Sequence, residues 1–280
     1  MMKSDSAARS ATVMQHGADD RSGATPEPGT QPASPRPRAL PISERPFGIT
    51  EQALADNRER APLVQIFERA CLSWHQRAAA SQSHGIGQNI RLDTSDQTTV
   101  AIAAECGCYQ GFSLAACLEI AAQANLPVQF LALDSFQGLP PLSQRDLELA
   151  PERAPYRNRV FFDATSVEKV QATIAPVLGK SRVDIVPGFF SETLPTLPEH
   201  RYFFVNIDCD LYEPHLECLD YFYPRMLSGG IIFFDDYHSI DFPMARQAID
   251  AFLADKPELL WHVRLGDDGP NMTKAYFVKR

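Results

Sequence analysis

Short apolar runs alternate with segments of helical spacing over the part of the chain that follows residue 98. Turn-forming residues bound the apolar runs, as they bound buried strands, and the segments between the runs repeat apolar positions every three or four residues. Apolar strands that alternate with helices predict a parallel sheet covered on both faces, so the expected fold class is α/β. The expected strands are residues 99–104, 129–133, 182–186, 202–207, 230–234, 260–265 and 275–278, and the expected helices are residues 113–124, 166–178, 215–226 and 244–254.

The last two apolar runs are joined by a short polar turn that has no room for a helix. Residues 266–271 read Gly-Asp-Asp-Gly-Pro-Asn, a composition typical of turns. Strands joined by so short a connection pair in antiparallel fashion, because a parallel pair needs a long crossover. We therefore predict a mostly parallel, seven-stranded sheet with an antiparallel hairpin at its C-terminal edge.

The N-terminal part of the chain differs in composition from the rest. Residues 1–46 hold seven of the 22 prolines and almost no large apolar side chains, so they cannot bury enough surface to offset their ordering entropy. We expect them to form a disordered tail; a targeting presequence is the alternative, which the acidic residues in this stretch argue against. Residues 47–95 are expected to form a helical cap and a polar connector, with the helix over 50–80 and Pro62 as a break or first-turn residue. Residues 96–280 are expected to form one domain.

Charge and composition exclude several classes of function. The chain has 26 Lys+Arg against 35 Asp+Glu and a net charge of −9, which does not favour binding to nucleic acid. No apolar run approaches the ~20 residues of a membrane helix, and the first residues lack the apolar core of a secretory signal. Six cysteines without regular spacing do not indicate a disulfide framework, and Cys106 and Cys108 are expected to be small buried side chains. We expect a cytoplasmic protein with neither nucleic acid nor membrane as its partner.

The first expected strand leads through a glycine turn into a helix. Residues Glu105 to Ser113 read Glu-Cys-Gly-Cys-Tyr-Gln-Gly-Phe-Ser, where Gly107 permits a tight turn and Gly111 a close approach of a ligand. In open α/β sheets, ligands bind at the carboxyl ends of the strands near this point. The spacing differs from the Gly-x-Gly-x-x-Gly of dinucleotide-binding folds, and its acid would repel a pyrophosphate and attract an amino group.

The second expected strand ends in Asp134, Ser135 and Phe136. Asp134 follows Gly111 by 23 residues, about where an acid binds the two hydroxyls of a ribose, and Phe136 is placed to stack on an adenine. Taken alone, Asp134 is more often a turn cap and Phe136 more often a core residue. Together with the acidic glycine loop, these residues predict a nucleoside site that favours S-adenosylmethionine over NAD.

Acidic residues follow two later strands that should be neighbours in the sheet. Asp208 ends one of these strands, and Asp235 and Asp236 end the next. Carboxylates that converge at one edge repel each other unless a cation neutralises them, and a set of oxygen ligands without Cys or His selects Mg²⁺, Mn²⁺ or Ca²⁺ over zinc. The alternative is that these acids only cap turns and helices. Their convergence favours a divalent-cation site.

Four motifs occur in the same order as in a known family and resemble those of the macrocin O-methyltransferases. They are Glu-Cys-Gly-Cys-Tyr-Gln-Gly at 105–111, Leu-Asp-Ser-Phe-Gln-Gly-Leu-Pro at 133–140, Ile-Asp-Cys-Asp-Leu-Tyr-Glu at 207–213 and Gly-Gly-Ile-Ile-Phe-Phe-Asp-Asp-Tyr at 229–237. The resemblance implies a Rossmann-like class I methyltransferase domain at 96–280, with S-adenosylmethionine as methyl donor. It also implies Mg²⁺ or Mn²⁺ held by Asp208, Asp235 and Asp236, a sugar hydroxyl or other small natural product as acceptor, and assembly into a homo-oligomer.

Two residues are candidates for the base that takes the proton of the acceptor hydroxyl. Asp210 lies two positions beyond Asp208, so both side chains face the same way if the extended pitch persists. His238 adjoins the acidic pair, and an ordinary histidine titrates near neutral pH. We favour Asp210. Two other functions stay open: a binding module that retains the nucleoside pocket without catalysis, and a nicotinamide-dependent oxidoreductase, which the glycine spacing disfavours.

Overall fold

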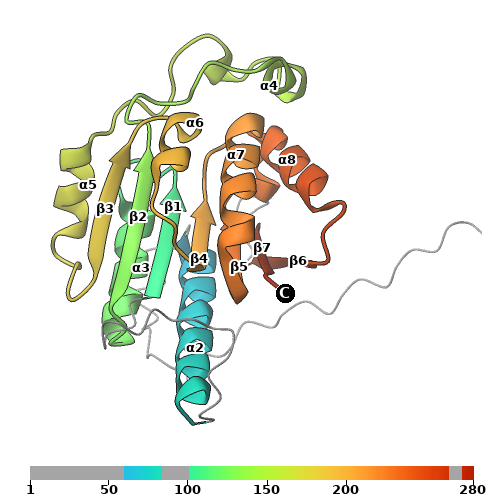
Figure 1. Ribbon diagram of the computed structural model, residues 1–280. Helices are drawn as coiled ribbons and strands as arrows, with labels where there is room; N and C mark the ends of the chain where they lie inside the picture. Colours follow the sequence, from blue (N-terminus) through green and yellow to red (C-terminus); the bar gives the residue numbers. More distant parts are fainter. Residues whose placement is uncertain (1–59, 84–100, 265–272) are drawn as a thin grey trace, which may run out of the picture. The chain divides into compact units, whose positions relative to one another are not determined.

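The computed structural model describes residues 60–83, 101–264 and 273–280, and these form a seven-stranded sheet with helices on both faces (Figure 1). The strand order is β3-β2-β1-β4-β5-β7-β6. Strands β1 to β5 pair in parallel, whereas β7 is antiparallel to both β5 and β6. The predicted fold class and its antiparallel edge are therefore confirmed. The strands are β1 (Ala101–Cys106), β2 (Val128–Asp134), β3 (Arg182–Pro187), β4 (Tyr202–Ile207), β5 (Met226–Phe234), β6 (Leu260–Arg264) and β7 (Thr273–Val278).

The direction of winding reverses at β1, which lies between β2 and β4. Cys106, the last residue of β1, is in register with Leu133 on one side and Ile207 on the other. Ile207 is in turn paired with Phe234. The residues that follow these four strand ends therefore leave the sheet at one level, on the edge where ligands bind in open α/β sheets.

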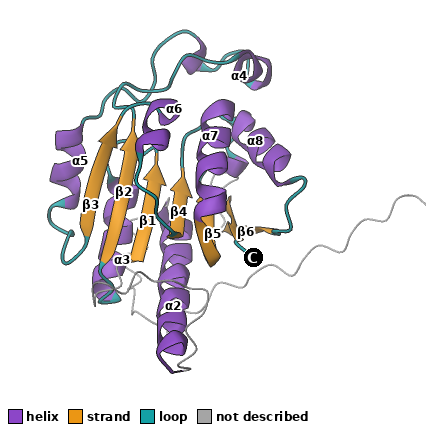
Figure 2. Cartoon of the chain, viewed as in Figure 1, coloured by secondary structure: helices purple, strands orange, loops and turns teal. Residues whose placement is uncertain are grey.

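Two apolar clusters lie between the strands and the helices, which Figure 2 draws in orange and purple. One joins the strands to α2, α3 and α5, and the other joins them to α6, α7 and α8. Burial on both faces explains why β4 is apolar at nearly every position and completely buried. The helices are α2 (Ala61–Ser83), α3 (Phe112–Gln123), α4 (Gln144–Leu149), α5 (Val167–Ile174), α6 (Phe190–Thr193), α7 (Tyr212–Phe222) and α8 (Pro243–Leu253), with short 3₁₀ helices η3 (Pro155–Arg157), η4 (Leu194–Thr196), η5 (Tyr223–Arg225) and η6 (Asp236–His238).

Helix α2 is the described part of the predicted N-terminal helix, and it packs directly on the sheet. Its Phe67 is fully buried, with ring centroids 5.6 Å from Phe130 of β2 and 4.9 Å from Phe204 of β4. Pro62 lies in the first turn, where the missing N–H costs nothing. No helix within the described ranges has the length and apolar character to cross a bilayer. The predicted tail at 1–46 and the predicted connector lie outside the described residues, and the domain boundaries stay predictions.

A third, smaller apolar cluster lies beyond the carboxyl ends of the strands, where Figure 1 shows α4. It contains Tyr156 of η3, which stacks on Phe242 with ring centroids 4.6 Å apart, and it also contains Leu211. The long mixed segment after β2 is therefore packed against the rim of the sheet and has a core of its own.

Candidate active site

Backbone hydrogen bonds continue one residue past the ends of the central strands. The N–H of Gly107 donates to the carbonyl of Leu133 at 2.8 Å, and the N–H of Asp208 donates to that of Cys106 at 2.9 Å. Asp235 donates in the same way to Ile207 at 3.1 Å. These bonds fix the first residue after each strand, so the side chains at this edge start from rigid positions.

The glycine loop lies against the strand that carries the acidic residues. Gly107 has a φ of 86°, and a Cβ at this position would overlap the carbonyl oxygen of Asp208. The predicted tight turn is therefore present, and it requires glycine for two separate reasons. Gly111 has a φ of 81°, but its close neighbour is Val170 of α5. Gly111 and Ser113 thus begin α3 and are not among the residues that line the cavity described below.

Asp134 holds the glycine loop and the next turn together. Its Oδ2 accepts the N–H of Tyr109 and its Oδ1 accepts the N–H of Phe136, each at 2.8 Å. Both donors have positive φ, 46° at Tyr109 and 55° at Phe136. Burial raises the pKa of Asp134, and the backbone N–H groups oppose that rise. Each oxygen retains a further lone pair, so Asp134 is able to accept from a ligand as well.

A cavity of about 460 Å³ opens at this edge of the sheet. Of the predicted site residues, Gly107, Asp134, Ser135, Asp208 and Asp210 line it. Further lining comes from the glycine loop, the segment after β2, the turn after β3, the turn after β4 and the first part of α7. These residues are Tyr109, Gly138, Leu139, Pro140, Pro141, Ser143, Asp146, Phe162, Gly188, Phe189, Phe190, Ser191, Cys209, Leu211, Glu213, Pro214 and Glu217.

Glu105 is in the core and is not among the residues that line this cavity, so its predicted role in binding the donor stays a prediction. Strand β1 extends to Cys106, two residues further than predicted, so Glu105 belongs to the sheet. It is 2% exposed and accepts a hydrogen bond from Nδ2 of Asn206 at 2.9 Å. Burial raises the pKa of Glu105 to about 8. Phe136 likewise packs against the core and is not among the cavity residues, which matches the alternative of a core role.

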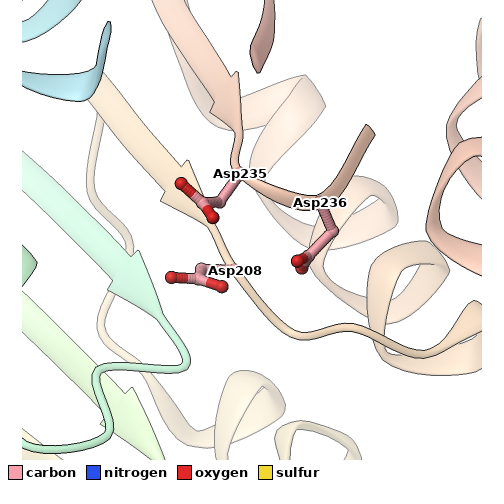
Figure 3. Close-up of side chains that lie close together, drawn as sticks. All are labelled: Asp208, Asp235 and Asp236. Carbon is pink, nitrogen blue, oxygen red and sulfur yellow. The ribbon is translucent and has the colours of Figure 1, made fainter. Parts of the chain in front are cut away.

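Asp208, Asp235 and Asp236 come together as the sequence predicted, and Figure 3 shows their carboxylates pointing toward one another. One oxygen from each lies within 4.8 Å of the others. Burial, together with the charges of Asp235 and Asp236, raises the pKa of Asp208 well above its usual range. This set of oxygen ligands fits a hard divalent cation, because a bound cation would offset the repulsion among the three carboxylates.

Lys274 also reaches the acidic residues, and sequence reasoning missed it. Its Nζ forms an ion pair with Oδ2 of Asp235 at 2.5 Å, and its side chain is 12% exposed. It comes from β7, which is inserted between β5 and β6. No local pattern around Lys274 indicated that its strand would lie beside β5.

The two candidate bases have different surroundings. Asp210 lines the cavity, but its φ is 62°, so the extended pitch assumed in its prediction ends with β4. Its N–H donates to Oδ2 of Asp236 at 2.9 Å. His238 is not among the cavity residues; its Nε2 is 2.9 Å from Nδ1 of His262, and burial lowers its pKa to about 4. The structure therefore supports only Asp210 at the cavity.

Asp146 is a second residue that sequence reasoning missed. It is 1% exposed, forms a capping box with Ser143 at the start of α4, and accepts the N–H of Tyr212 at 2.8 Å. Its carboxylate thus joins α4 to the first turn of α7. The spacing of Ser143 and Asp146 is that of a capping box and was the available signal.

All six cysteines are buried and none forms a disulfide. Burial raises the pKa of the thiols of Cys106, Cys209 and Cys218. Thiols in such surroundings are unreactive. The prediction that Cys106 and Cys108 are small buried side chains is confirmed.

The sequence of this chain matches a known protein family. Residues 94–258 match the family described as Macrocin-O-methyltransferase (TylF). The chain belongs to the macrocin-O-methyltransferase family. All four motifs that resemble this family lie within the matched region, and so do the acidic residues around the cavity.

Two curated relatives are O-methyltransferases by name. Mycinamicin III 3''-O-methyltransferase from Micromonospora griseorubida is 31% identical over 121 residues, which are 42% of this chain and 46% of the relative. Demethyldecarbamoylnovobiocin O-methyltransferase from Streptomyces niveus is 34% identical over 126 residues, 43% of this chain and 45% of the relative. The match spans less than half the length of each relative.

Solved structures support the fold. The O-methyltransferase NovP superposes with a TM-score of 0.53 and 24% identity, over 64% of this chain and 72% of its own. The calicheamicin methyltransferase CalS11 superposes with a TM-score of 0.52 and 19% identity, over 85% of this chain and 83% of its own. The chain therefore has the class I O-methyltransferase fold.

Proposed function

We propose that this protein transfers the methyl group of S-adenosylmethionine to a hydroxyl oxygen on the sugar of a natural product. The observation that carries the proposal is the cavity, which is bounded by the glycine loop and Asp134 on one side and by Asp208 and Asp210 on the other. The site proposed for the methyl donor and the site proposed for proton removal thus lie in the same cavity. Family membership and the names of the relatives support methyl transfer to an oxygen.

The donor side of the cavity fits a nucleoside. Asp134 has lone pairs left for the ribose hydroxyls after it accepts the two backbone N–H groups. Ser135 follows it at the rim, and the aromatic side chains of Phe162 and Phe189 line the same space and are available to stack on an adenine. S-adenosylmethionine supplies a methyl carbon activated by its sulfonium, and sulfur keeps the electron pair when the carbon–sulfur bond breaks.

The acidic residues fit Mg²⁺ or Mn²⁺. Asp208, Asp235 and Asp236 would hold the ion, since their oxygens converge and the ligands are all hard. A bound divalent cation supplies positive charge that stabilises a developing alkoxide. Lys274 already places one positive charge at Asp235, which lowers the repulsion among the carboxylates before any cation arrives.

Asp210 is the proposed general base. It lines the cavity beside Asp208, and its backbone is fixed by the hydrogen bond from its N–H to Asp236. A left-handed backbone at a residue other than glycine costs energy and is found most often where a side chain has to be aimed. Asp210 would accept the proton of the acceptor hydroxyl as the new carbon–oxygen bond forms.

The test is mass-spectrometric screening of hydroxylated glycosides with S-adenosylmethionine and Mg²⁺. The expected result is a product heavier by one methylene group, together with S-adenosylhomocysteine. The matched control is the Asp134→Ala variant, which should lose donor binding. Binding of NADH without any binding of S-adenosylmethionine would overturn the proposal.

A further inference from the structure

The turn that carries Asp210 is closed within three residues. The N–H of Leu211 donates to the carbonyl of Cys209 at 2.6 Å, so the chain reverses around Asp210, whose φ is 62°. A three-residue turn with a positive φ at its central residue is rare and strained. Such a conformation persists only where the surrounding contacts hold it. The direction of the Asp210 side chain therefore depends on the contacts that fix Cys209 and Leu211.

His215 contacts the residues on both sides of Asp210. It lies near the start of α7 and is completely buried. Its Nδ1 is 2.8 Å from the carbonyl oxygen of Leu211 and 3.4 Å from Sγ of Cys209. The backbone N–H of His215 also donates to the carbonyl of Leu211, at 3.3 Å. The imidazole thus bridges the first and the last residue of the turn.

The contact with Leu211 determines which nitrogen of the ring carries the hydrogen. A carbonyl oxygen only accepts hydrogen bonds, so a ring nitrogen 2.8 Å away from it has to donate, and Nδ1 is the protonated nitrogen. Burial lowers the pKa of His215 to about 4, so the ring is neutral near pH 7 and Nε2 carries no hydrogen. The ring therefore holds the turn as a neutral donor in one fixed tautomer.

The other ring nitrogen of His215 makes the protein less stable. Nε2 is buried and has no hydrogen-bond partner within the described part of the chain. An unpaired buried acceptor costs free energy, whereas a leucine at this position would fill similar space without that cost. A local cost of this kind is expected where a residue serves a functional site. The histidine is therefore better explained by its hold on the turn than by packing.

We infer that His215 is a positioning residue for Asp210, because the N–H at its Nδ1 holds the three-residue turn in the conformation that directs the Asp210 carboxylate to the cavity. This role rests on the proposed function, in which Asp210 accepts the proton of the acceptor hydroxyl. His215 is not among the residues that line the cavity, so it acts only through the turn.

Three variants of the whole protein separate the donor at Nδ1 from the packing of the ring. His215→Asn keeps an N–H donor close to the position of Nδ1 but is smaller, so the melting temperature should fall while kcat stays near the wild-type value. His215→Leu fills the space without a donor, so kcat should fall at least about tenfold at an unchanged KM for the acceptor. Its melting temperature should be no lower than that of His215→Asn. The control Leu219→Val opens a small cavity on the same helix and should lower the melting temperature without changing kcat.

Two further measurements show whether His215 acts through the turn. Adding His215→Leu to Asp210→Asn should lower kcat no further, because the direction of the base has no effect once the base is absent. Hydrogen exchange followed by NMR reports on the turn without any substrate. The amide of Leu211, which closes the turn, should exchange at least about tenfold faster in His215→Leu than in His215→Asn.

Three results would overturn the inference and leave the proposed function intact. They are a wild-type kcat in His215→Leu, a loss of kcat in His215→Asn as large as that in His215→Leu, and a further loss when His215→Leu is added to Asp210→Asn. Failure of the proposed function is seen separately, in a wild-type protein that transfers no methyl group. In that case equal exchange of the Leu211 amide in the two His215 variants would still show that the donor at Nδ1 does not hold the turn.

Discussion

Asn206 donates a hydrogen bond from Nδ2 to Oε1 of Glu105 across the β1–β4 pair, at 2.9 Å. Both side chains are 2% exposed. Oε2 of Glu105 and Oδ1 of Asn206 have no hydrogen-bond partner among the described residues. A protonated Glu105 is able to donate from Oε2, whereas an ionised Glu105 would be an unpaired buried charge. Burial therefore favours the neutral carboxylic acid directly beneath the glycine loop, although the hydrogen bond from Asn206 opposes it.

The first prediction concerns stability and pH. The pKa of Glu105 is about 8 in the folded protein against an ordinary 4.5, so unfolding releases a proton between these values. The free energy of unfolding should fall as the pH rises through this window and should be fully retained below it. Glu105→Gln should remove this dependence and stabilise the protein at pH 8 by roughly 4 kcal/mol. Urea unfolding at pH 5 and pH 8 measures both effects.

The control for this variant is Glu105→Ala, which opens a cavity and leaves Nδ2 of Asn206 without its acceptor. It should destabilise the protein at both pH values, by about 1–3 kcal/mol for the lost partner alone. A Glu105→Gln variant that is less stable than wild type at pH 8 would show that the carboxylate is ionised in the folded protein.

The second prediction concerns Asp134. Asp134→Asn replaces one acceptor oxygen by an NH₂ group, which cannot accept the N–H of Tyr109 or Phe136. Binding of S-adenosylhomocysteine should weaken by about 1–3 kcal/mol, since a ribose acceptor is lost and the loop is loosened. Titration calorimetry measures the affinity, and Asp184→Asn, on the edge strand β3, is the control. Unchanged affinity in Asp134→Asn would remove Asp134 from the donor site.

The third prediction concerns the cation. Asp208→Asn should raise the melting temperature of the metal-free protein, because it relieves repulsion from Asp235 and Asp236. The same change should abolish the rise in melting temperature that Mg²⁺ or Mn²⁺ gives the wild-type protein. Thermal unfolding with and without EDTA measures both. An equal response to Mg²⁺ in the two proteins would exclude Asp208 as a ligand.

The fourth prediction concerns proton removal. Asp210→Asn keeps the N–H that donates to Asp236 and should leave donor binding and the KM for the acceptor largely unchanged. Its kcat should fall about 10²–10⁴-fold, which is the usual contribution of a general base. His238→Gln is the matched variant outside the cavity and should retain near-normal kcat. A larger loss in His238→Gln than in Asp210→Asn would reverse the assignment.

The regular elements could be predicted because their signals are local. The strand at Tyr202–Ile207 was predicted with its observed bounds, since an apolar run interrupted only by Asn206 and bounded by polar turns fixes both ends. The meeting of Asp208 with Asp235 followed from the alternation of strands and helices, which places consecutive parallel strands side by side. Family resemblance strengthened these expectations but did not supply the geometry.

The details that the sequence did not predict depend either on one or two residues at the end of a strand or on pairing between strands that are distant in the sequence. A strand longer by two residues moved Glu105 from the turn into the core. A left-handed residue at Asp210 ended the alternation from which its direction was argued, although it still lines the cavity. Lys274 is brought in by the sheet order, and a single local window carries no information about that order.

The hydrogen bond from Tyr212 to Asp146 has a practical consequence for redesign. Helix α4 is tied to α7 by this buried carboxylate and by Arg145, whose guanidinium lies over the ring of Tyr212, whereas the glycine loop and β4 are in direct backbone contact at Gly107. The side of the cavity proposed for the acceptor is thus held to α7 through side chains, which leaves more room for change than the close backbone contact on the side proposed for the donor. Chimaeras that exchange residues 139–161 between relatives should fold provided that Asp146 travels with the insert, which makes this segment the place to alter acceptor scope.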